Sequence, residues 1–205
     1  MRLAALAIAA GFAFGASGLG AEPLWITEDI LSKSFDLKGE AITIEREPVA
    51  GSGLSEELAQ NCPPACIQPN EAAEGVKTVG ELEVISFLEG EVANGTGLLL
   101  DSRMPETFLK GTIPGAVNVP YSTLDPKNPY RDEILKALGA VELPGGGLDF
   151  AGAMELTMFC SGPWCDQSAR AISNLASAGY PAEKLSYYRG GLQVWSLLGL
   201  TVAQP

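Results

Sequence analysis

The chain has 205 residues, of which 46% are hydrophobic, and this is enough for one packed domain of ordinary size with an extension. Its formal net charge is -12, from 13 basic and 25 acidic residues, which argues against nucleic acids and anionic membrane surfaces as partners. The chain contains no histidine, so any mechanism in which its own imidazole acts as a base, a proton shuttle or a metal ligand is excluded.

Residues 1–21 have the pattern of a secretory signal peptide. Arg2 supplies a positive charge, an apolar run extends from Leu3 to about Phe14, and small residues lead to Ala21. We expect cleavage near the Ala21–Glu22 bond rather than a membrane anchor, because no second apolar stretch follows. The mature protein is therefore expected to be periplasmic or secreted, with no membrane partner after cleavage.

Export would place the four cysteines in an oxidising compartment, where disulfides form. They fall into two close pairs, Cys62 with Cys66 and Cys160 with Cys165. The first pair lies in a proline-rich loop, and we interpret it as a local structural disulfide rather than a functional thiol pair. A zinc site shared by all four is disfavoured because the pairs are far apart in the sequence. We expect no metal and no organic cofactor.

Residues 22–77 are predicted to form an N-terminal extension of the main domain, which spans 78–205. Residues 34–46 contain an alternating segment after a glycine turn, which predicts a small hairpin. The following segment is rich in loop residues, and 55–59 could form a short helix. Because the extension is too small to bury a core of its own, we expect it to pack on the domain that follows.

Strand and helix patterns alternate through the main domain. Thr78 and Glu81 have the spacing of a capping box, which predicts a helix whose apolar face runs to Leu88. Strands are predicted at 98–101, 116–119, 156–159 and 185–188, helices at 105–110, 130–138, 167–178 and 192–198, and a glycine-rich connection at 142–153. This alternation predicts an α/β fold in which helices cover both faces of a parallel sheet.

One cysteine lies where a predicted strand ends. The run 156–159 is apolar, Cys160 follows it directly, and a tight segment with Gly162 and Pro163 leads into the helix at 167–178. In an open parallel sheet, ligands bind beyond the carboxyl ends of the strands. The free N–H groups and the dipole of the following helix would stabilise a thiolate or a bound anion there. The pattern therefore predicts that Cys160 is a nucleophile.

Three motifs in order resemble the rhodanese family over about residues 78–202. Residues 101–120, with an Asp-x-Arg start followed by Gly-x-Ile-Pro-Gly-Ala, are similar to the family's first signature. Residues 189–192, with Trp195 and Gly199, resemble its closing motif, and a cysteine ends the strand between the two. The resemblance implies a five-stranded parallel sheet flanked by helices. It also implies a cysteine that accepts sulfane sulfur as a persulfide and passes it to a nucleophile.

The sequence departs from the family pattern at the same sites. The usual histidine of the first signature is Thr112, and the position of the usual arginine, counted from Cys160, holds Cys165. Counting from Cys165 instead restores that arginine as Arg170, but Cys165 lies past the strand end, so we assign the nucleophile to Cys160. Pro163 removes one N–H group from the loop that would hold an anionic substrate. A smaller set of exported rhodanese-like proteins is similar in carrying paired cysteines here.

Three functions remain open for the Cys160–Cys165 pair. The favoured one is sulfur transfer through a persulfide on Cys160, with Cys165 resolving the persulfide by forming a disulfide. The others are a thiol–disulfide relay and a non-catalytic binding module with a structural disulfide. Sulfur transfer would require a small sulfur-containing anion or a persulfide donor, and a thiol acceptor that could be a protein.

Residues around these cysteines are candidates for substrate binding. The candidates are Gly162, Trp164, Arg170, Arg189, Asp101 and Arg103. Asp101 and Arg103 could position the loop, or form an internal ion pair that only fixes a turn. Arg170 could bind an anion or be solvated, and for Arg189 binding and structural roles are equally open. Ser168 could donate to a loop thiolate or cap its helix.

Overall fold

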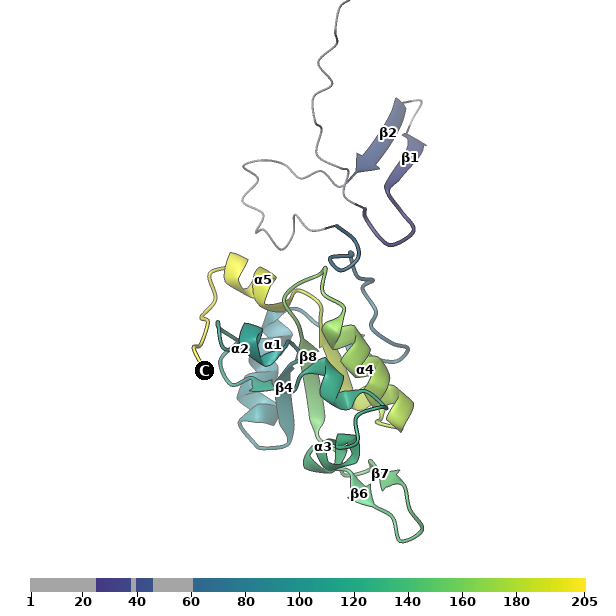
Figure 1. The fold of residues 1–205 in the computed structure, drawn as a ribbon. Coiled ribbons are helices and arrows are strands. Elements are labelled where there is room, and N and C mark those ends of the chain that lie inside the picture. Colours follow the sequence, from purple (N-terminus) through teal and green to yellow (C-terminus); the bar gives the residue numbers. More distant parts are fainter. Residues whose placement is uncertain (1–24, 38–39, 46–60) are drawn as a thin grey trace, which may run out of the picture.

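The computed structural model describes residues 25–37, 40–45 and 61–205 (Figure 1). The predicted signal peptide and the predicted helix at 55–59 lie outside these residues. None of the helices within this part of the chain is long and apolar enough to cross a membrane.

A five-stranded parallel sheet forms the centre of the main domain, as predicted. Its strand order is β3-β9-β8-β4-β5. The strands are β3 (Lys77–Thr78), β4 (Gly97–Asp101), β5 (Val117–Asn118), β8 (Glu155–Phe159) and β9 (Leu185–Tyr188). In β8 every residue after the first is buried, and β8 pairs with β4 on one side and β9 on the other. The residue that follows β8 is therefore held at the middle of the carboxyl edge of the sheet.

Helices cover both faces of the sheet (Figure 1). They are α1 (Glu81–Phe87), which continues as a π-helical turn (Leu88–Val92), α2 (Pro105–Phe108), α3 (Arg131–Ala137), α4 (Gln167–Ala178) and α5 (Gly191–Leu197), with 3-10 turns at Tyr121–Leu124 and Ala182–Lys184. One buried cluster includes Leu135 of α3 and Ile172 of α4, and a second includes Val84 of α1 and Trp195 of α5. These two cores confirm the two-layered covering that the alternating pattern predicts.

The predicted capping box is wrong. Thr78 lies in β3, where its hydroxyl donates to the carbonyl of Asn70, and Gly80 is the N-cap of α1. Glu83, rather than Glu81, accepts the Gly80 N–H at 3.0 Å, and the Glu81 carboxylate instead accepts the Tyr188 hydroxyl at 2.8 Å. The cap lies two residues further along the chain than the pattern predicts, because Thr78 belongs to the short edge strand β3.

Two small hairpins lie outside the central sheet. The first pairs β1 (Ser32–Leu37) with β2 (Glu40–Glu45), so the predicted hairpin is present but starts two residues earlier. The second pairs β6 (Val141–Glu142) with β7 (Leu148–Asp149), and it begins one residue before the stretch 142–153 that the sequence predicts to be only a connection. Strands of two residues are too short to produce a readable alternation.

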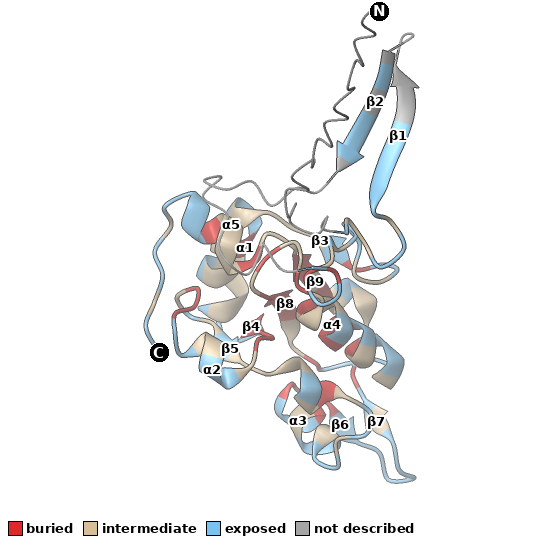
Figure 2. Cartoon of the chain, turned by 45° about the horizontal axis from the view of Figure 1, so that its top comes forward, coloured by how far each residue is buried: buried red, intermediate tan, exposed pale blue. Residues whose placement is uncertain are grey.

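The part of the extension nearest the domain packs against it, as expected. Ala65 and Val76 are buried, and Cys62 is 6% exposed. The Gln68 N–H donates to the carbonyl of Pro163 at 2.8 Å, so this segment lies beside the loop between β8 and α4. The β1–β2 hairpin extends away from the domain in both ribbon views (Figures 1 and 2).

Candidate active site at the loop between β8 and α4

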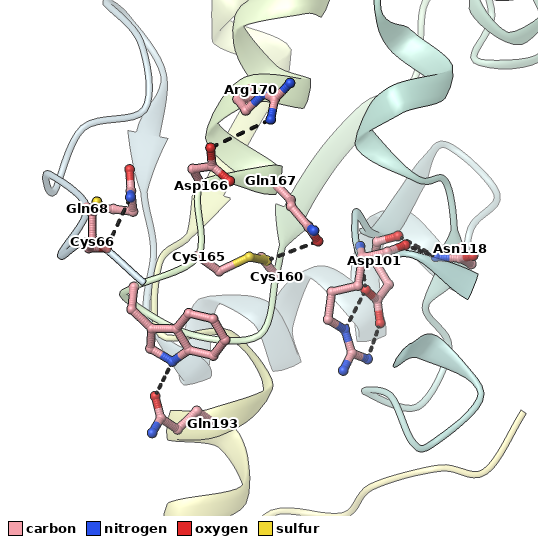
Figure 3. Close-up of a disulfide and its surroundings, with 12 residues drawn as sticks. Cys66, Gln68, Asp101, Asn118, Cys160, Cys165, Asp166, Gln167, Arg170 and Gln193 are labelled. Atoms are coloured by element: carbon pink, nitrogen blue, oxygen red, sulfur yellow. Dashed lines mark hydrogen bonds and ion pairs between the residues drawn. A yellow bond between two sulfur atoms is a disulfide. The ribbon is translucent and has the colours of Figure 1, made fainter. Parts of the chain in front are cut away.

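The two cysteines of the loop form a disulfide at the carboxyl end of the central strand (Figure 3). Cys160 follows Phe159, the last residue of β8, and Cys165 lies two residues before α4 begins. Their Cα atoms are 6.1 Å apart. The exposed fractions are only 2% for Cys160 and 7% for Cys165, so the sulfur atoms are largely shielded from solvent.

Four successive backbone carbonyls of the loop, those of residues 160–163, accept hydrogen bonds from N–H groups. The carbonyls of Cys160 and Ser161 accept from α5, from Leu192 N at 3.0 Å and Gln193 N at 2.8 Å. The Gly162 carbonyl accepts the Cys165 N–H at 3.0 Å, and the Pro163 carbonyl accepts from Gln68. The loop is thus fixed from one side by α5 and from the other by the extension.

Several N–H groups of the same segment have no acceptor among the residues that the structure describes. They are the N–H groups of Ser161, Gly162, Trp164 and Asp166 in the loop, and of Gln167, Ser168 and Ala169 in the first turn of α4. Such groups, together with the helix dipole, form an environment that favours an anion or a thiolate. Pro163 contributes none, as expected from its ring.

Two glycines allow close approach at this loop. Gly191, at the start of α5, has φ +60°, and a Cβ there would lie 2.5 Å from the Cys160 carbonyl oxygen and 2.7 Å from Gly162 N. A Cβ on Gly162 would lie 2.6 Å from Gln193 Oε1, the atom that accepts the Trp164 indole N–H at 3.2 Å. Trp164 is thereby tied to α5, and Gly162 leaves room for that contact.

Gln167 is a site residue that the sequence analysis missed. Its Oε1 lies 3.7 Å from Cys160 Sγ (Figure 3). When Cys160 is reduced, its thiol could donate to Oε1, and the amide N–H groups of the same side chain could donate to the thiolate. The only available signal was its position as the first residue of the helix after the cysteine loop.

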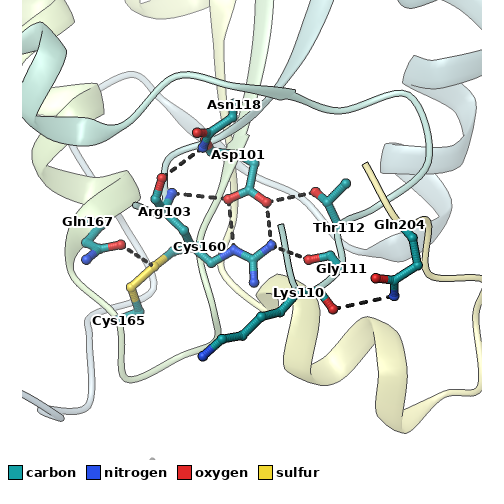
Figure 4. A network of polar contacts seen from close by, with 10 residues as sticks. All are labelled: Asp101, Arg103, Lys110, Gly111, Thr112, Asn118, Cys160, Cys165, Gln167 and Gln204. Carbon is teal, nitrogen blue, oxygen red and sulfur yellow. Dashed lines mark hydrogen bonds and ion pairs between the residues drawn. A yellow bond between two sulfur atoms is a disulfide. The ribbon is translucent and has the colours of Figure 1, made fainter. Parts of the chain in front are cut away.

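Asp101 and Arg103 form a buried network beside the site (Figure 4). Arg103 Nε donates to Asp101 Oδ1 at 2.8 Å, and Arg103 Nη2 donates to Asp101 Oδ2 at 2.5 Å. The Arg103 side chain is 4% exposed and the Asp101 side chain is 0% exposed. Arg103 also donates to the Gly111 carbonyl, and Thr112 donates to the Asp101 carboxylate, both at 2.7 Å. This geometry fits an internal ion pair that fixes the turn.

That turn is attached to the cysteine strand. Ser102 N donates to the carbonyl of Phe159 at 3.0 Å, directly before Cys160. Asn118 completes the connection by donating to the carbonyls of Asp101 at 3.0 Å and Arg103 at 2.8 Å. The Asp101–Arg103 ion pair therefore helps to hold the start of the cysteine loop, through backbone hydrogen bonds to the end of β8.

The other two arginines are also held by protein groups. Arg189 donates through Nη2 and Nε to the Gln68 carbonyl, at 2.8 and 3.1 Å, and through Nε to the Pro69 carbonyl at 3.2 Å. Arg170 is half-exposed, 3.8 Å from the Asp166 carboxylate, and its guanidinium lies 4.5 Å above the centre of the Tyr121 ring. The structure thus places Arg189 against the extension, and it places Arg170 between the Asp166 carboxylate and the Tyr121 ring.

Two hydroxyls near the loop are buried. Asp166 is the N-cap of α4, so Ser168 does not cap its helix, and Ser168 Oγ and the Tyr187 hydroxyl lack hydrogen-bond partners within residues 25–37, 40–45 and 61–205. Burial raises the pKa of Tyr187, while the Arg189 charge and the nearby Ser168 hydroxyl act in the opposite direction.

The second pair, Cys62 and Cys66, also forms a disulfide, with Cα atoms 4.5 Å apart. In the described part of the chain, no group of three or more cysteines and carboxylates is arranged to hold a metal ion. An apolar cavity of about 380 Å³ lies elsewhere, between the β4–β5 edge and α3, and its lining includes Leu98, Val119 and Ile134. None of the loop residues lines it.

A protein-family model described as "Rhodanese-like domain" matches residues 85–198. Among solved structures, a protein from Bacillus halodurans is 16% identical, with a TM-score of 0.47, covering 62% of this chain and 76% of that chain. A rhodanese-related protein from Thermoplasma volcanium is 19% identical, with a TM-score of 0.43, covering 63% of this chain and 99% of that chain.

A thiosulfate sulfurtransferase from Pseudomonas aeruginosa is 20% identical, with a TM-score of 0.42, covering 66% of this chain but only 21% of that chain. No curated protein sequence matches the chain.

Proposed function

The chain belongs to the rhodanese-like domain family, and on this premise we propose that it is a sulfurtransferase that carries sulfane sulfur as a persulfide on Cys160. The observation that carries this proposal is the position of Cys160. It lies at the carboxyl end of the central strand, next to a loop and a helix start whose N–H groups have no acceptor among the described residues. These groups would stabilise both the thiolate and the charged persulfide.

Sulfur transfer begins from the reduced pair. The Cys160 thiolate attacks the outer sulfur of thiosulfate or of a persulfide donor, forms a new S–S bond and displaces sulfite or the donor thiolate. An acceptor thiolate then attacks the outer sulfur of the Cys160 persulfide, becomes a persulfide itself and restores the Cys160 thiolate. No net oxidation occurs in this cycle.

Cys165 provides a second exit. Its thiolate attacks Cys160 Sγ, forms the Cys160–Cys165 disulfide and displaces the outer sulfur, which leaves as hydrosulfide with the proton that the Cys165 thiol gave up. The structure contains the disulfide that would result. A reductant must break it before Cys160 accepts sulfur again.

The proposal includes the compartment and the partners. An exported mature protein would meet an oxidising environment, and two disulfides in one chain support this. The donor would be thiosulfate or a persulfide, and the acceptor a small or protein thiol. No arginine replaces the usual loop arginine, so the loop N–H groups and the amide of Gln167 would do most of the anion binding.

A specific observation favours a second candidate function. Both sulfur atoms are bonded to each other and nearly inaccessible, as they would be in a binding module whose disulfide only holds the loop. The two functions differ in one property. A structural disulfide resists dithiol reduction, whereas a resting catalytic disulfide opens and leaves Cys160 reactive.

Intact-mass analysis tests the proposal. The mature protein is reduced, freed of reductant and incubated with thiosulfate or a small persulfide donor, alongside Cys160→Ser and Cys165→Ser. We expect Cys165→Ser to retain the mass of one added sulfur atom, because it lacks the resolving thiol. Wild type should return to the disulfide with release of sulfide, and Cys160→Ser should gain nothing.

Sulfur that appears on Cys160→Ser as readily as on Cys165→Ser would contradict the assignment of the carrier. A Cys160–Cys165 disulfide that survives reductant in the folded protein would favour the binding module instead.

A further inference from the structure

We propose that Cys62–Cys66 is the redox partner of Cys160–Cys165, so that the two pairs form a dithiol–disulfide relay within one chain. The extension disulfide would accept electrons from an external dithiol and pass them to the loop disulfide. The inference rests on the proposed function in one respect, namely that the Cys160–Cys165 disulfide is a product that must be reduced again.

The extension brings its disulfide to the cysteine loop through direct backbone contacts. Gln68 N donates to the Pro163 carbonyl at 2.8 Å, and the Gln68 side chain donates to the Cys66 carbonyl at 3.1 Å. Cys66 is two residues from Gln68, and Cys165 is two residues from Pro163. Two residues span at most about 7 Å on each side of this hydrogen bond, so the two pairs lie at the same loop, and a movement of the loop and the extension has to bring Cys66 Sγ to Cys165 Sγ.

Arg189 strengthens the same contact. It follows β9, and its guanidinium donates to the carbonyls of Gln68 and Pro69 at 2.8 to 3.2 Å. These charge-assisted hydrogen bonds hold the extension at the carboxyl edge of the sheet. A structural disulfide would not need to be placed at this edge, because closure of its loop stabilises the chain wherever the loop lies.

The difference in burial between the two disulfides indicates that electrons pass from the extension pair to the loop pair. Cys160 is 2% and Cys165 7% exposed, which shields their disulfide from an external reductant. In the extension disulfide Cys62 is also buried, at 6% exposed, but Cys66 is only half-buried and the two prolines between them are exposed, so Cys66 is the sulfur that an external thiolate can attack. An external dithiol therefore meets the extension disulfide first, and the loop disulfide is reached more easily from within the chain than from solvent.

The short loop that Cys62 and Cys66 close also favours a redox role for this disulfide over a structural one. The pair is separated by only four positions in the sequence. Stabilisation by loop closure grows with loop length, so a disulfide this local contributes least to stability. Closely spaced cysteines are also the arrangement in which one thiol can resolve a mixed disulfide formed by the other.

The steps balance in electrons and protons. An external dithiol reduces Cys62–Cys66 and becomes a disulfide. The Cys66 thiol gives its proton to solvent, and the Cys66 thiolate attacks Cys165 Sγ, forming a Cys66–Cys165 bond and releasing Cys160 as a thiolate beside Gln167. The Cys62 thiolate then attacks Cys66 Sγ, reforming Cys62–Cys66 and releasing Cys165, which takes up the proton that Cys62 lost. Two electrons move from the external dithiol to the loop.

The rate of reduction of Cys160–Cys165 tests the relay in the full-length mature protein. A tethered dithiol acts at an effective concentration of about 1 mM, so with an external dithiol at about 0.1 mM the loop disulfide should open about tenfold more slowly without the tether. The comparison is between wild type and the Cys62→Ser, Cys66→Ser double variant. Thiol alkylation followed by peptide mass mapping reports each pair separately.

Glu71→Gln is the matched control, because Glu71 is exposed in the same extension and the variant keeps all four thiols. It should open the loop disulfide at the wild-type rate. Thermal unfolding of the oxidised proteins verifies that the double variant is folded. Equal rates in wild type and a folded double variant would overturn the relay.

Trapping the mixed disulfide tests the assigned pairing even where a variant is less stable. The Cys62→Ser, Cys160→Ser variant keeps only Cys66 and Cys165, and mild oxidation with a small disulfide should join these two within one chain. The Cys66→Ser, Cys165→Ser variant keeps Cys62 and Cys160 and should give a much lower yield. Equal yields, or no Cys66–Cys165 bond, would contradict the relay. Neither experiment uses sulfane sulfur, so a failure here is distinct from a failure of sulfur transfer.

Discussion

At the scale of single residues, the cysteine loop depends on neighbours that carry no chemistry of their own. Gly191 lets α5 begin directly against the loop backbone, and α5 then supplies the N–H groups that hold the Cys160 and Ser161 carbonyls. Asp101 and Arg103 fix the adjoining strand end, which hydrogen-bonds to Phe159. The geometry at Cys160 is therefore set from two sides.

Gly191→Ala should lower the free energy of unfolding and displace the loop. The φ of +60° and the approach of a Cβ to 2.5 Å from the Cys160 carbonyl oxygen both oppose a side chain. We expect a loss of roughly 2–4 kcal/mol in urea denaturation, from backbone strain plus overpacking. Gly199→Ala is the matched control, with φ +73° but open space around the Cβ, and should lose only about 1 kcal/mol. Equal losses of unfolding free energy in the two variants would show that contact with the loop does not restrict residue 191.

Asp101→Asn should destabilise the fold strongly. The substitution keeps the shape but leaves the Arg103 charge buried without its partner, which costs about 3–5 kcal/mol. Glu142→Gln breaks the exposed ion pair with Lys136 and should cost about 0–1 kcal/mol. Denaturant unfolding of the three proteins measures both. A small loss for Asp101→Asn would mean that water reaches this pair.

At the scale of elements, α4 is connected to β8 at both of its ends. Its first turn follows the cysteine loop, and it ends at Ala178, the end of the predicted range, where Gly179 with φ +96° is the C-cap. The Tyr180 hydroxyl then donates to the Met154 carbonyl at 2.6 Å, just before β8, and to the Leu138 carbonyl at 3.3 Å, just after α3. One side chain thus joins three elements around the strand that ends in Cys160.

Tyr180→Phe should lower the free energy of unfolding by about 1–3 kcal/mol, because two carbonyls lose their shared donor in a buried position. Ser177→Ala removes a hydrogen bond on the exposed side of the same helix and should have little effect. Thermal unfolding of the two variants distinguishes a buried tie from an ordinary surface contact. Similar losses in both variants would contradict this role for Tyr180.

The elements that sequence could predict are those whose pattern is local. The apolar runs at 98–101 and 156–159 are central strands buried on both faces, and such strands are readable as continuous apolar segments. Two-residue strands such as β3 and β6 have no readable pattern. Thr78, which the sequence predicts to cap α1, therefore lies in β3 instead.

The missed parts of the site depend on contacts between distant residues. Arg189 binds the carbonyl of Gln68, 121 positions away, and Gln68 reaches Pro163 across the loop. No spacing or periodicity encodes such a contact, so the packing of the extension against the site could be expected only in general terms. Gln167 could be placed on the helix but not toward Cys160.

At the scale of the whole molecule, the fold buries three tyrosine hydroxyls in a chain with a net charge of -12. Burial raises the pKa of Tyr180, and burial together with the Glu81 carboxylate raises the pKa of Tyr188, both above the ordinary value of 10.0. A raised pKa in the folded state means that the neutral phenol is the form the fold accepts. This contribution is complete below the ordinary pKa and is lost as pH rises above it.

The free energy of unfolding should therefore fall as pH rises through and above about 10, with no loss from these groups at neutral pH. Urea denaturation across this range measures the slope. Tyr180→Phe should reduce the slope, since it removes one of the groups that must ionise. An unchanged slope in Tyr180→Phe would show that its phenol is not held neutral by the fold.

The central claim is that Cys160 carries sulfur that can be passed on. The most direct measurement is a single turnover with radiolabelled sulfane sulfur. Reduced Cys165→Ser protein is loaded from a labelled donor, separated from it and mixed with a thiol acceptor. The account predicts that the label leaves the protein and appears on the acceptor as a persulfide, and that Cys160→Ser carries none. Label that never binds, or that stays on the protein when acceptor is added, would contradict the account.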